Sequence, residues 1–271
     1  MPRRVRLDAE LVRRGLARSR EHAVELVNAG RVTVRGTVAG KPATAVETDA
    51  PVVVREDADD AGWASRGAHK LLGALEAFGP RGLTVAGRRC LDAGASTGGF
   101  TDVLLRGGAR EVVAVDVGYG QLVWKLQTDD RVLVHDRTNV RNLTPEQIGG
   151  TVDLVVADLS FIYLRLVLPA MAACMSEGAD LVPMVKPQFE VGKERLPSGG
   201  VVRDPELRIE AVTGVVASAA EAGLTLRGVT ASPLPGPSGN VEYFLWLRRG
   251  VPLAETEAEQ LVRAAVAAGP Q

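Results

Sequence analysis

Residues 90–102 have the sequence CLDAGASTGGFTD, and this stretch decides the fold. A short apolar run ends at the carboxylate Asp92, glycines follow at Gly94, Gly98 and Gly99, and apolar residues resume at helical spacing from Phe100. Glycine allows positive φ and close approach of a ligand, and a helix N-terminus offers free N–H groups. The stretch predicts a strand, a nucleotide-type cofactor turn and a helix. The alternative is a tight turn whose glycines serve packing alone.

The sequence pattern of this turn differs from the dinucleotide fingerprint G-x-G-x-x-G, because an acidic residue precedes the glycines in D-x-G-x-S-x-G-G-F. A second acid, Asp116, closes the next apolar run, where a ribose-binding carboxylate belongs. An acid before the glycines would repel a pyrophosphate, so we expect S-adenosylmethionine, whose methionine end is positive, rather than NAD. The candidate cofactor-binding residues are Asp92, Gly94, Ser96, Gly98, Gly99, Phe100, Asp116, Val117, Asp136 and Asp158.

Beyond this turn, strand and helix patterns alternate, which predicts an α/β fold with a doubly wound, Rossmann-like sheet. The strand candidates are Arg89–Asp92, Val112–Asp116, Val132–His135, Val152–Asp158, Asp180–Lys186, Leu226–Ser232 and Val241–Leu247. Ligands bind at the carboxyl ends of such strands. Asp92, Asp116, Asp136, Asp158 and Lys186 fall at these ends, although Asp136 could be no more than a helix cap.

The first 55 residues predict a smaller α+β domain. Two short helical patterns begin near Leu7 and Ala23, and strand patterns follow at 32–36 and 52–55. Residues 1–41 carry ten Lys and Arg against four Asp and Glu, which favours a phosphate-rich partner over a merely solvated face. An acidic tract of small residues then predicts a linker at 56–64, before a second domain at 65–271.

The length and composition of the chain indicate a globular protein with more than one folded unit. At 271 residues, 46% hydrophobic and with a net charge of −1, the chain can bury a sizeable core and a smaller module. Its two cysteines, Cys90 and Cys174, lie far apart, so neither a disulfide framework nor a zinc site is indicated. No signal peptide or spanning segment is evident, and we expect a cytoplasmic protein.

Asp158 and Lys186 follow consecutive apolar strands and are the candidates for chemistry. A lysine at the end of a buried strand is desolvated, and a nearby cation such as Lys70 would further favour the neutral amine that accepts a proton. Asp158 would oppose that effect while orienting the amine. The alternative for Lys186 is a purely structural salt bridge to Asp158.

Several motifs together carry a family resemblance. The pattern from Leu7 to Val34 resembles the S4 RNA-binding domain, and further motifs are SRGAHKL at 65–71, the turn at 92–100, DLSF at 158–161, VKPQFE at 185–190 and GNVEYF at 239–244. The chain resembles the TlyA/hemolysin A family, an S4 domain joined to an FtsJ-type ribose 2′-O-methyltransferase, over almost its whole length.

The resemblance implies methyl transfer from S-adenosylmethionine to a ribose 2′-hydroxyl of ribosomal RNA, free or in ribosomal subunits, at cytidine in 16S and 23S rRNA. It places a catalytic tetrad on Lys70, Asp158, Lys186 and Glu242, with Lys186 as the base or as the group that orients the hydroxyl, and it implies no metal. We expect RNA contacts from Arg4, Arg6, Arg18, Arg20, Lys41 and Arg66. Despite the family name, we do not expect membrane lysis.

Two other functions remain open on the sequence. One is a non-catalytic RNA-binding factor of ribosome assembly, which a test of radiolabelled methyl transfer would distinguish. The other is an NAD-linked oxidoreductase, which calorimetry with both cofactors would distinguish.

Overall fold

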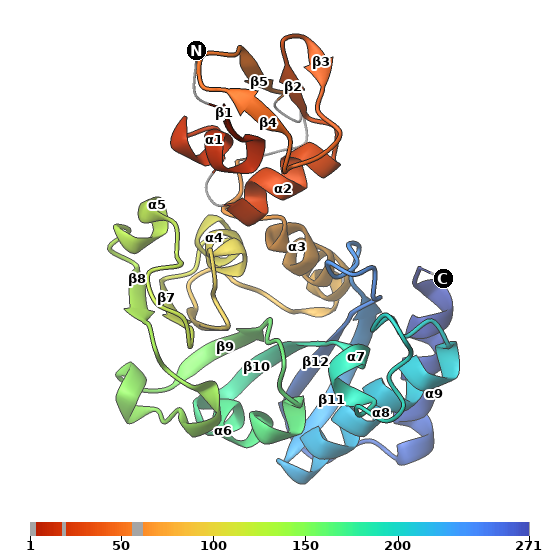
Figure 1. Cartoon of the computed structure of the whole chain (residues 1–271). Helices are drawn as coiled ribbons and strands as arrows, with labels where there is room; N and C mark the ends of the chain where they lie inside the picture. Colours follow the sequence, from red (N-terminus) through yellow and green to blue (C-terminus); the bar gives the residue numbers. More distant parts are fainter. Residues whose placement is uncertain (1–3, 18–19, 56–61, 271) are drawn as a thin grey trace. The chain divides into compact units, whose positions relative to one another are not determined.

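The computed structural model describes residues 4–17, 20–55 and 62–270. Two compact units make up the chain, residues 1–62 and residues 63–271 (Figure 1). Each unit has hydrophobic clusters of its own. The predicted boundaries of 1–55, 56–64 and 65–271 stay a prediction.

The first unit packs two helices with two small sheets. Its helices are α1 (Leu7–Arg13) and α2 (Arg20–Asn28), and its strands are β1 (Arg4–Arg6), β2 (Val32–Val34), β3 (Thr37–Val38), β4 (Ala45–Glu47) and β5 (Val52–Val54). β1 pairs with β4, and β2 lies between β3 and β5. The sequence did not predict β1, β3 and β4, because each contains a single valine, whereas the equally short β2 and β5 contain two and three.

The second unit is built on a seven-stranded sheet in the order β11-β12-β10-β9-β6-β7-β8. Its strands are β6 (Arg89–Ala93), β7 (Glu111–Val115), β8 (Val132–His135), β9 (Val152–Ala157), β10 (Met175–Val185), β11 (Leu224–Ala231) and β12 (Tyr243–Arg249). Within this sheet β12 runs antiparallel to both neighbours, and the other strands are parallel to one another. The predicted doubly wound sheet is confirmed.

Helices cover both faces of this sheet (Figure 1). Residues of α3 (Gly67–Phe78), α4 (Gly99–Arg106) and α5 (Trp124–Gln127) share one hydrophobic cluster with the sheet. Residues of α6 (Leu168–Ala173), α8 (Pro205–Glu221) and α9 (Glu255–Ala268) share the other. The remaining helical turns are α7 (Pro187–Glu190), η1 (Gly79–Arg81), η2 (Val140–Asn142), η3 (Glu146–Ile148) and η4 (Leu164–Leu166).

β8 matches its predicted bounds; the ends of the other six strands differ from the prediction by at most two residues, except for the start of β10. β10 begins at Met175 rather than Asp180, and its pairing with β9 shifts register between these two residues. The irregular start of β10 includes the exposed residues Glu177 and Gly178, which interrupt the apolar pattern from which the strand was predicted. β12 begins at Tyr243, so Glu242 precedes the strand instead of lying within it.

Candidate active site

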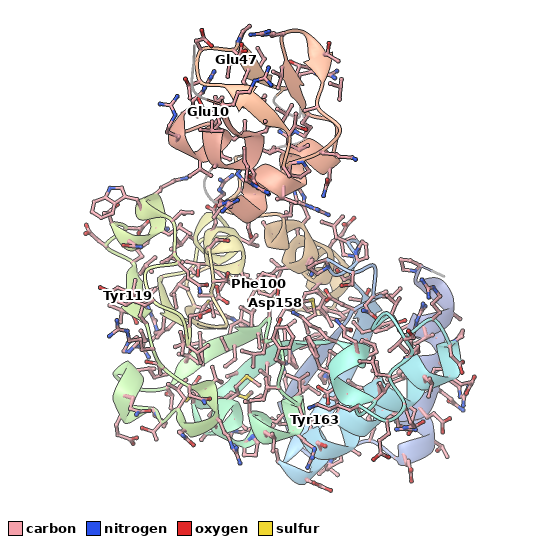
Figure 2. All side chains as sticks on the ribbon, in the orientation of Figure 1. Glu10, Glu47, Phe100, Tyr119, Asp158 and Tyr163 are labelled. Carbon is pink, nitrogen blue, oxygen red and sulfur yellow. The ribbon has the colours of Figure 1, made fainter. Side chains whose placement is uncertain are left out.

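The parallel strands β6 to β10 bring their carboxyl ends to one edge of the sheet. Asp92 lies one residue before the end of β6, and Asp116, Asp136, Asp158 and Lys186 directly follow β7, β8, β9 and β10. Asp158 follows the last residue of β9 near the middle of the view in Figure 2. The structure therefore brings the predicted strand-end residues to a common edge.

Asp92 is the most unusual carboxylate of this edge. The residue is 0% exposed. Its Oδ2 accepts a hydrogen bond from Thr101 Oγ1 at 2.7 Å. Its Oδ1 has no hydrogen-bond partner among the described residues. Burial raises the pKa of Asp92 to about 7, and the nearby charges of Asp158 and Asp116 act in the same direction. A cationic ligand group would favour the ionised form of this carboxylate, so the unpaired oxygen fits such a group.

The glycines of the turn have a packing role. Gly94 has φ +86°, and a Cβ there would lie 2.5 Å from the carbonyl oxygen of Asp158. Gly98 has φ +99°, and a Cβ would collide with the side chains of Leu126 and Leu122. A Cβ on Gly99 would likewise strike Ser65 and Ala68. Packing accounts for these glycines, so the case for a cofactor depends on the carboxylates around them.

Asp116 and Asp136 each accept hydrogen bonds from backbone N–H groups of the surrounding loops. Asp116 accepts hydrogen bonds from the backbone N–H of Ser96 at 2.9 Å and of Gly118 at 2.7 Å, and Asp136 accepts one from Gly120 at 2.8 Å. Asp116 thereby connects the glycine turn after β6 to the loop after β7.

Two apolar candidates of the cofactor site differ sharply in exposure. Val117 is 69% exposed beside Asp116, and its side chain is available to a ligand. Phe100 is buried with its ring against Phe244, at a centroid distance of 6.0 Å. The side chain of Phe100 belongs to the core, and only its backbone can serve a ligand.

The four tetrad residues form two lysine–carboxylate pairs, of which Lys70–Glu242 is buried and Lys186–Asp158 has a half-buried carboxylate. Lys186 Nζ lies 2.6 Å from Asp158 Oδ1 and donates a hydrogen bond to Ser160 Oγ at 2.9 Å. Lys70 Nζ lies 2.6 Å from Glu242 Oε2, while Glu242 Oε1 has no hydrogen-bond partner among the described residues. Both lysines are buried, and Glu242 is fully enclosed.

One member of each pair lines a pocket of about 710 Å³. Lys186 from the end of β10 and Glu242 from the start of β12 both line it, together with Phe161, Phe189, Lys193 and Asn240. Most of the surface that lines this pocket is apolar. This arrangement places a lysine amine, held by a carboxylate and a hydroxyl, at the wall of a cavity large enough for a nucleoside-sized ligand.

Phe161 is a site residue that the sequence reasoning did not single out. It is 90% exposed, its φ is +61°, and its ring centroid lies 5.0 Å from that of Phe189. A large aromatic residue in the left-handed region and open to solvent is uncommon, and such outliers gather at functional sites. The available signal was its place three residues after Asp158 in the DLSF motif.

The candidate RNA-binding residues lie in both units. Arg4, Arg6, Arg20 and Lys41 are exposed on the first unit, and Arg66 is exposed directly before α3 in the second. Arg18 lies outside the described residues. Within the described ranges, no group of three or more His, Cys, Asp or Glu side chains is arranged to hold a metal ion, and no helix is long and apolar enough to cross a membrane.

Comparisons with known proteins match both units. The family model of the FtsJ-like methyltransferases matches residues 63–249, and that of the S4 domain matches residues 5–52. The 16S/23S rRNA (cytidine-2′-O)-methyltransferase TlyA of Mycobacterium tuberculosis is 61% identical over 272 residues, covering 100% of both chains. Hemolysin A of Brachyspira hyodysenteriae is 35% identical, covering 89% of this chain and 98% of its own.

A solved structure agrees with this assignment. A candidate hemolysin from Streptococcus thermophilus superposes with a TM-score of 0.76 at 36% identity, covering 98% of this chain and 96% of the other. Sequence and structural similarity thus extend over both units. The chain belongs to the TlyA/hemolysin A family, in which an S4 domain precedes an FtsJ-like methyltransferase domain.

Proposed function

We propose that this enzyme transfers a methyl group from S-adenosylmethionine to the 2′-hydroxyl of a ribose in ribosomal RNA, at cytidine in 16S and 23S rRNA. The observation that carries the proposal is that Lys186, paired with Asp158, and Glu242, paired with Lys70, line one pocket. The full-length similarity to an enzyme named for this reaction supports the choice of substrate.

The cofactor site would be the carboxyl edge of β6 and β7. The unpaired oxygen of buried Asp92 suits the positive methionine end, and Asp116 suits the ribose hydroxyls of the cofactor. Exposed Val117, next to Asp116, suits an adenine face. When bound, S-adenosylmethionine supplies an electrophilic methyl group on a sulfonium that is already a good leaving group.

Lys186 would assist removal of the proton from the 2′-hydroxyl. That hydroxyl is a weak nucleophile near neutral pH, so alignment and proton removal are the main tasks of the protein. Asp158 and Ser160 fix the Lys186 amine at the pocket wall. Lys70 and Glu242, paired at the same pocket, would position the ribose and the reacting amine.

The aromatic residues of the pocket suit a nucleobase. Phe161 and Phe189 offer an open ring face beside Lys186, and unstacked RNA bases commonly stack on such rings. The basic S4 unit, predicted at residues 1–55 with a linker at 56–64, would supply phosphate contacts. Arg66 would add a contact from the methyltransferase unit.

The decisive experiment is methyl transfer in vitro. Full-length protein, radiolabelled S-adenosylmethionine and 16S or 23S rRNA transcribed in vitro should give labelled RNA, and nuclease digestion with mass spectrometry should identify 2′-O-methylcytidine. Lys186→Ala is the matched negative control. RNA binding without any transfer by the wild-type protein would instead support a non-catalytic assembly factor.

A further inference from the structure

The S4 unit has a recurring arrangement of charges. Two of its carboxylates, Asp8 and Glu47, each lie between two arginines that come from different elements. An acid lowers the positive potential of an RNA-binding surface, so electrostatics alone gives no reason for these acids to lie there. Their geometry indicates a different role.

Asp8 is a buried carboxylate with all its hydrogen-bonding capacity in use. Its Oδ1 accepts from Arg6 Nε at 3.1 Å and from the backbone N–H of Ala9 at 2.7 Å; its Oδ2 accepts from Arg6 Nη2 at 2.7 Å and from Arg20 Nη2 at 3.2 Å. The Asp8 side chain is 3% exposed, whereas those of Arg6 and Arg20 are 54% and 57% exposed. The carboxylate is thus enclosed while both guanidinium groups keep donors facing solvent.

Glu47 repeats this arrangement on β4. It pairs with Arg35, and its Oε1 lies 3.7 Å from Arg4 Nη2. Arg4 and Arg6 occupy alternate positions of β1 and therefore project to the same side of that strand. The two carboxylates together hold four exposed arginines from three segments: Arg4 and Arg6 of β1, Arg20 of α2, and Arg35 of the turn between β2 and β3.

Glu10 of the same unit pairs with the exposed Arg13, whose side chain is 59% exposed, and with Arg14; the Arg14 pair shows by contrast what a structural ion pair looks like. Arg14 also donates to the carbonyl oxygens of Ala50 and Thr48, and only 21% of the Arg14 side chain is exposed. The guanidinium N–H groups of Arg14 thus donate to acceptors within the S4 unit itself. Among the described residues, no such set of backbone carbonyls accepts from the guanidinium groups of Arg6 and Arg20.

We propose that Asp8 and Glu47 are positioning residues that hold Arg6 with Arg20 and Arg4 with Arg35 as a preformed binding surface for the phosphates of an RNA backbone. The inference depends on the proposed function for its partner, structured ribosomal RNA. Planar guanidinium forks recognise phosphates through paired hydrogen bonds, and a fixed fork loses less freedom on binding than a mobile one.

Removal of the Asp8 charge should change the RNA affinity in the direction opposite to the one that net charge alone predicts. Asp8→Asn raises the net charge of the S4 unit by one, which by itself would strengthen RNA binding. If Asp8 positions the arginines, the variant should instead bind 23S rRNA, transcribed in vitro, about fivefold or more weakly, because two long side chains must then be ordered during binding. Glu47→Gln should act in the same direction, and its partly exposed site makes it the safer variant for folding.

Asp49→Asn is the matched control, because it makes the same change of charge at an exposed carboxylate of the same unit that forms no ion pair with the described residues. Its RNA affinity should be unchanged or slightly higher. Cofactor affinity and the melting temperature of the full-length variants check that folding is intact.

A double-mutant cycle separates positioning from damage to the fold. In a protein that already carries Arg6→Gln and Arg20→Gln, the further change Asp8→Asn should no longer weaken RNA binding. Folded Asp8→Asn and Glu47→Gln proteins that bind RNA as tightly as wild type or more tightly would overturn the inference. Failure of the proposed function is a separate result: wild-type protein would bind these RNAs and transfer no methyl group.

Discussion

Lys186 carries the sharpest prediction at the scale of single residues. Lys186→Ala removes the amine that Asp158 and Ser160 hold at the pocket wall. Methyl transfer should fall at least about 100-fold, the usual loss when a general base is removed. Single-turnover transfer at saturating RNA measures the effect, and calorimetry with S-adenosylmethionine should show that cofactor binding persists.

Lys186→Arg distinguishes proton transfer from electrostatics. A guanidinium keeps the positive charge and can keep the pair with Asp158, but it does not give up its proton. We therefore expect the Arg variant to be nearly as inactive as the Ala variant. If it transferred methyl groups at close to the wild-type rate, Lys186 would have a purely electrostatic or structural role.

Asp92 gives a prediction about pH. Because burial raises the pKa of Asp92 to about 7 from an ordinary 3.8, the folded protein retains a proton between these pH values that the unfolded chain has released. The free energy of unfolding of the ligand-free protein should therefore fall as pH rises from about 4 to 7, by roughly 4 kcal/mol at most from this residue.

Asp92→Asn should remove this contribution, since Asn does not titrate and can still accept from Thr101. At pH 7.5 the variant should be more stable than wild type without ligand, yet bind S-adenosylmethionine at least about tenfold more weakly, because it lacks the negative charge. Thermal melts across pH and calorimetry measure the two effects. Glu190, whose pKa burial also raises to about 7, keeps its own pH dependence in both proteins. Equal cofactor affinity in the variant would contradict a role for the Asp92 charge.

At the scale of elements, the loop after β9 combines residues of the proposed catalytic and base-binding groups. It carries Asp158, Ser160 and Phe161 in succession, and Glu190 of α7 supports its far end by accepting the backbone N–H of Leu164 at 2.9 Å. The Phe161–Phe189 contact joins the same loop and helix. The loop that holds Lys186 through Asp158 and Ser160 thus also carries an exposed ring face.

Phe161→Ala tests the ring face. Stacking of a base on an aromatic side chain contributes about 1 to 3 kcal/mol, so kcat/KM for RNA should fall roughly tenfold or more. Because Phe161 is almost fully exposed, the melting temperature and the cofactor affinity should not change. Phe161→Trp is the control that keeps a ring and should stay active; an active Ala variant would exclude stacking as the function of Phe161.

At the scale of the whole molecule, the two units have separate hydrophobic clusters. A chain starting at Trp63 keeps every residue of the methyltransferase clusters and should fold and bind S-adenosylmethionine. It should methylate RNA poorly, because most phosphate contacts are predicted on the S4 unit. Full activity of the shortened chain on free 23S rRNA would contradict that division of labour.

Salt provides the second whole-molecule test. The affinity of the full-length protein for RNA should fall steeply as salt concentration rises, since each neutralised phosphate releases counterions. The shortened chain should show a shallower dependence. Filter binding over a range of KCl concentrations measures both slopes, and equal slopes would place the phosphate contacts on the methyltransferase unit.

The sequence by itself determined the sheet, its strand ends and the candidate residues at them. Long apolar strands separated by helices have a clear periodicity, and parallel strands must bring their carboxyl ends to one edge, so Asp92, Asp116, Asp158 and Lys186 could be grouped without coordinates. The motifs around Lys70 and Glu242 added two residues that lie far from these in the chain.

Only the tertiary structure decided how those residues pair and what surrounds them. Lys70 and Glu242 are 172 positions apart, and no local pattern links them. The burial that leaves one oxygen of Asp92 without a partner, the exposure of Phe161 and the packing role of the glycines depend on neighbours from several strands and helices. Periodicity reports which side of an element is apolar, whereas a contact between distant segments is fixed only when the whole chain packs.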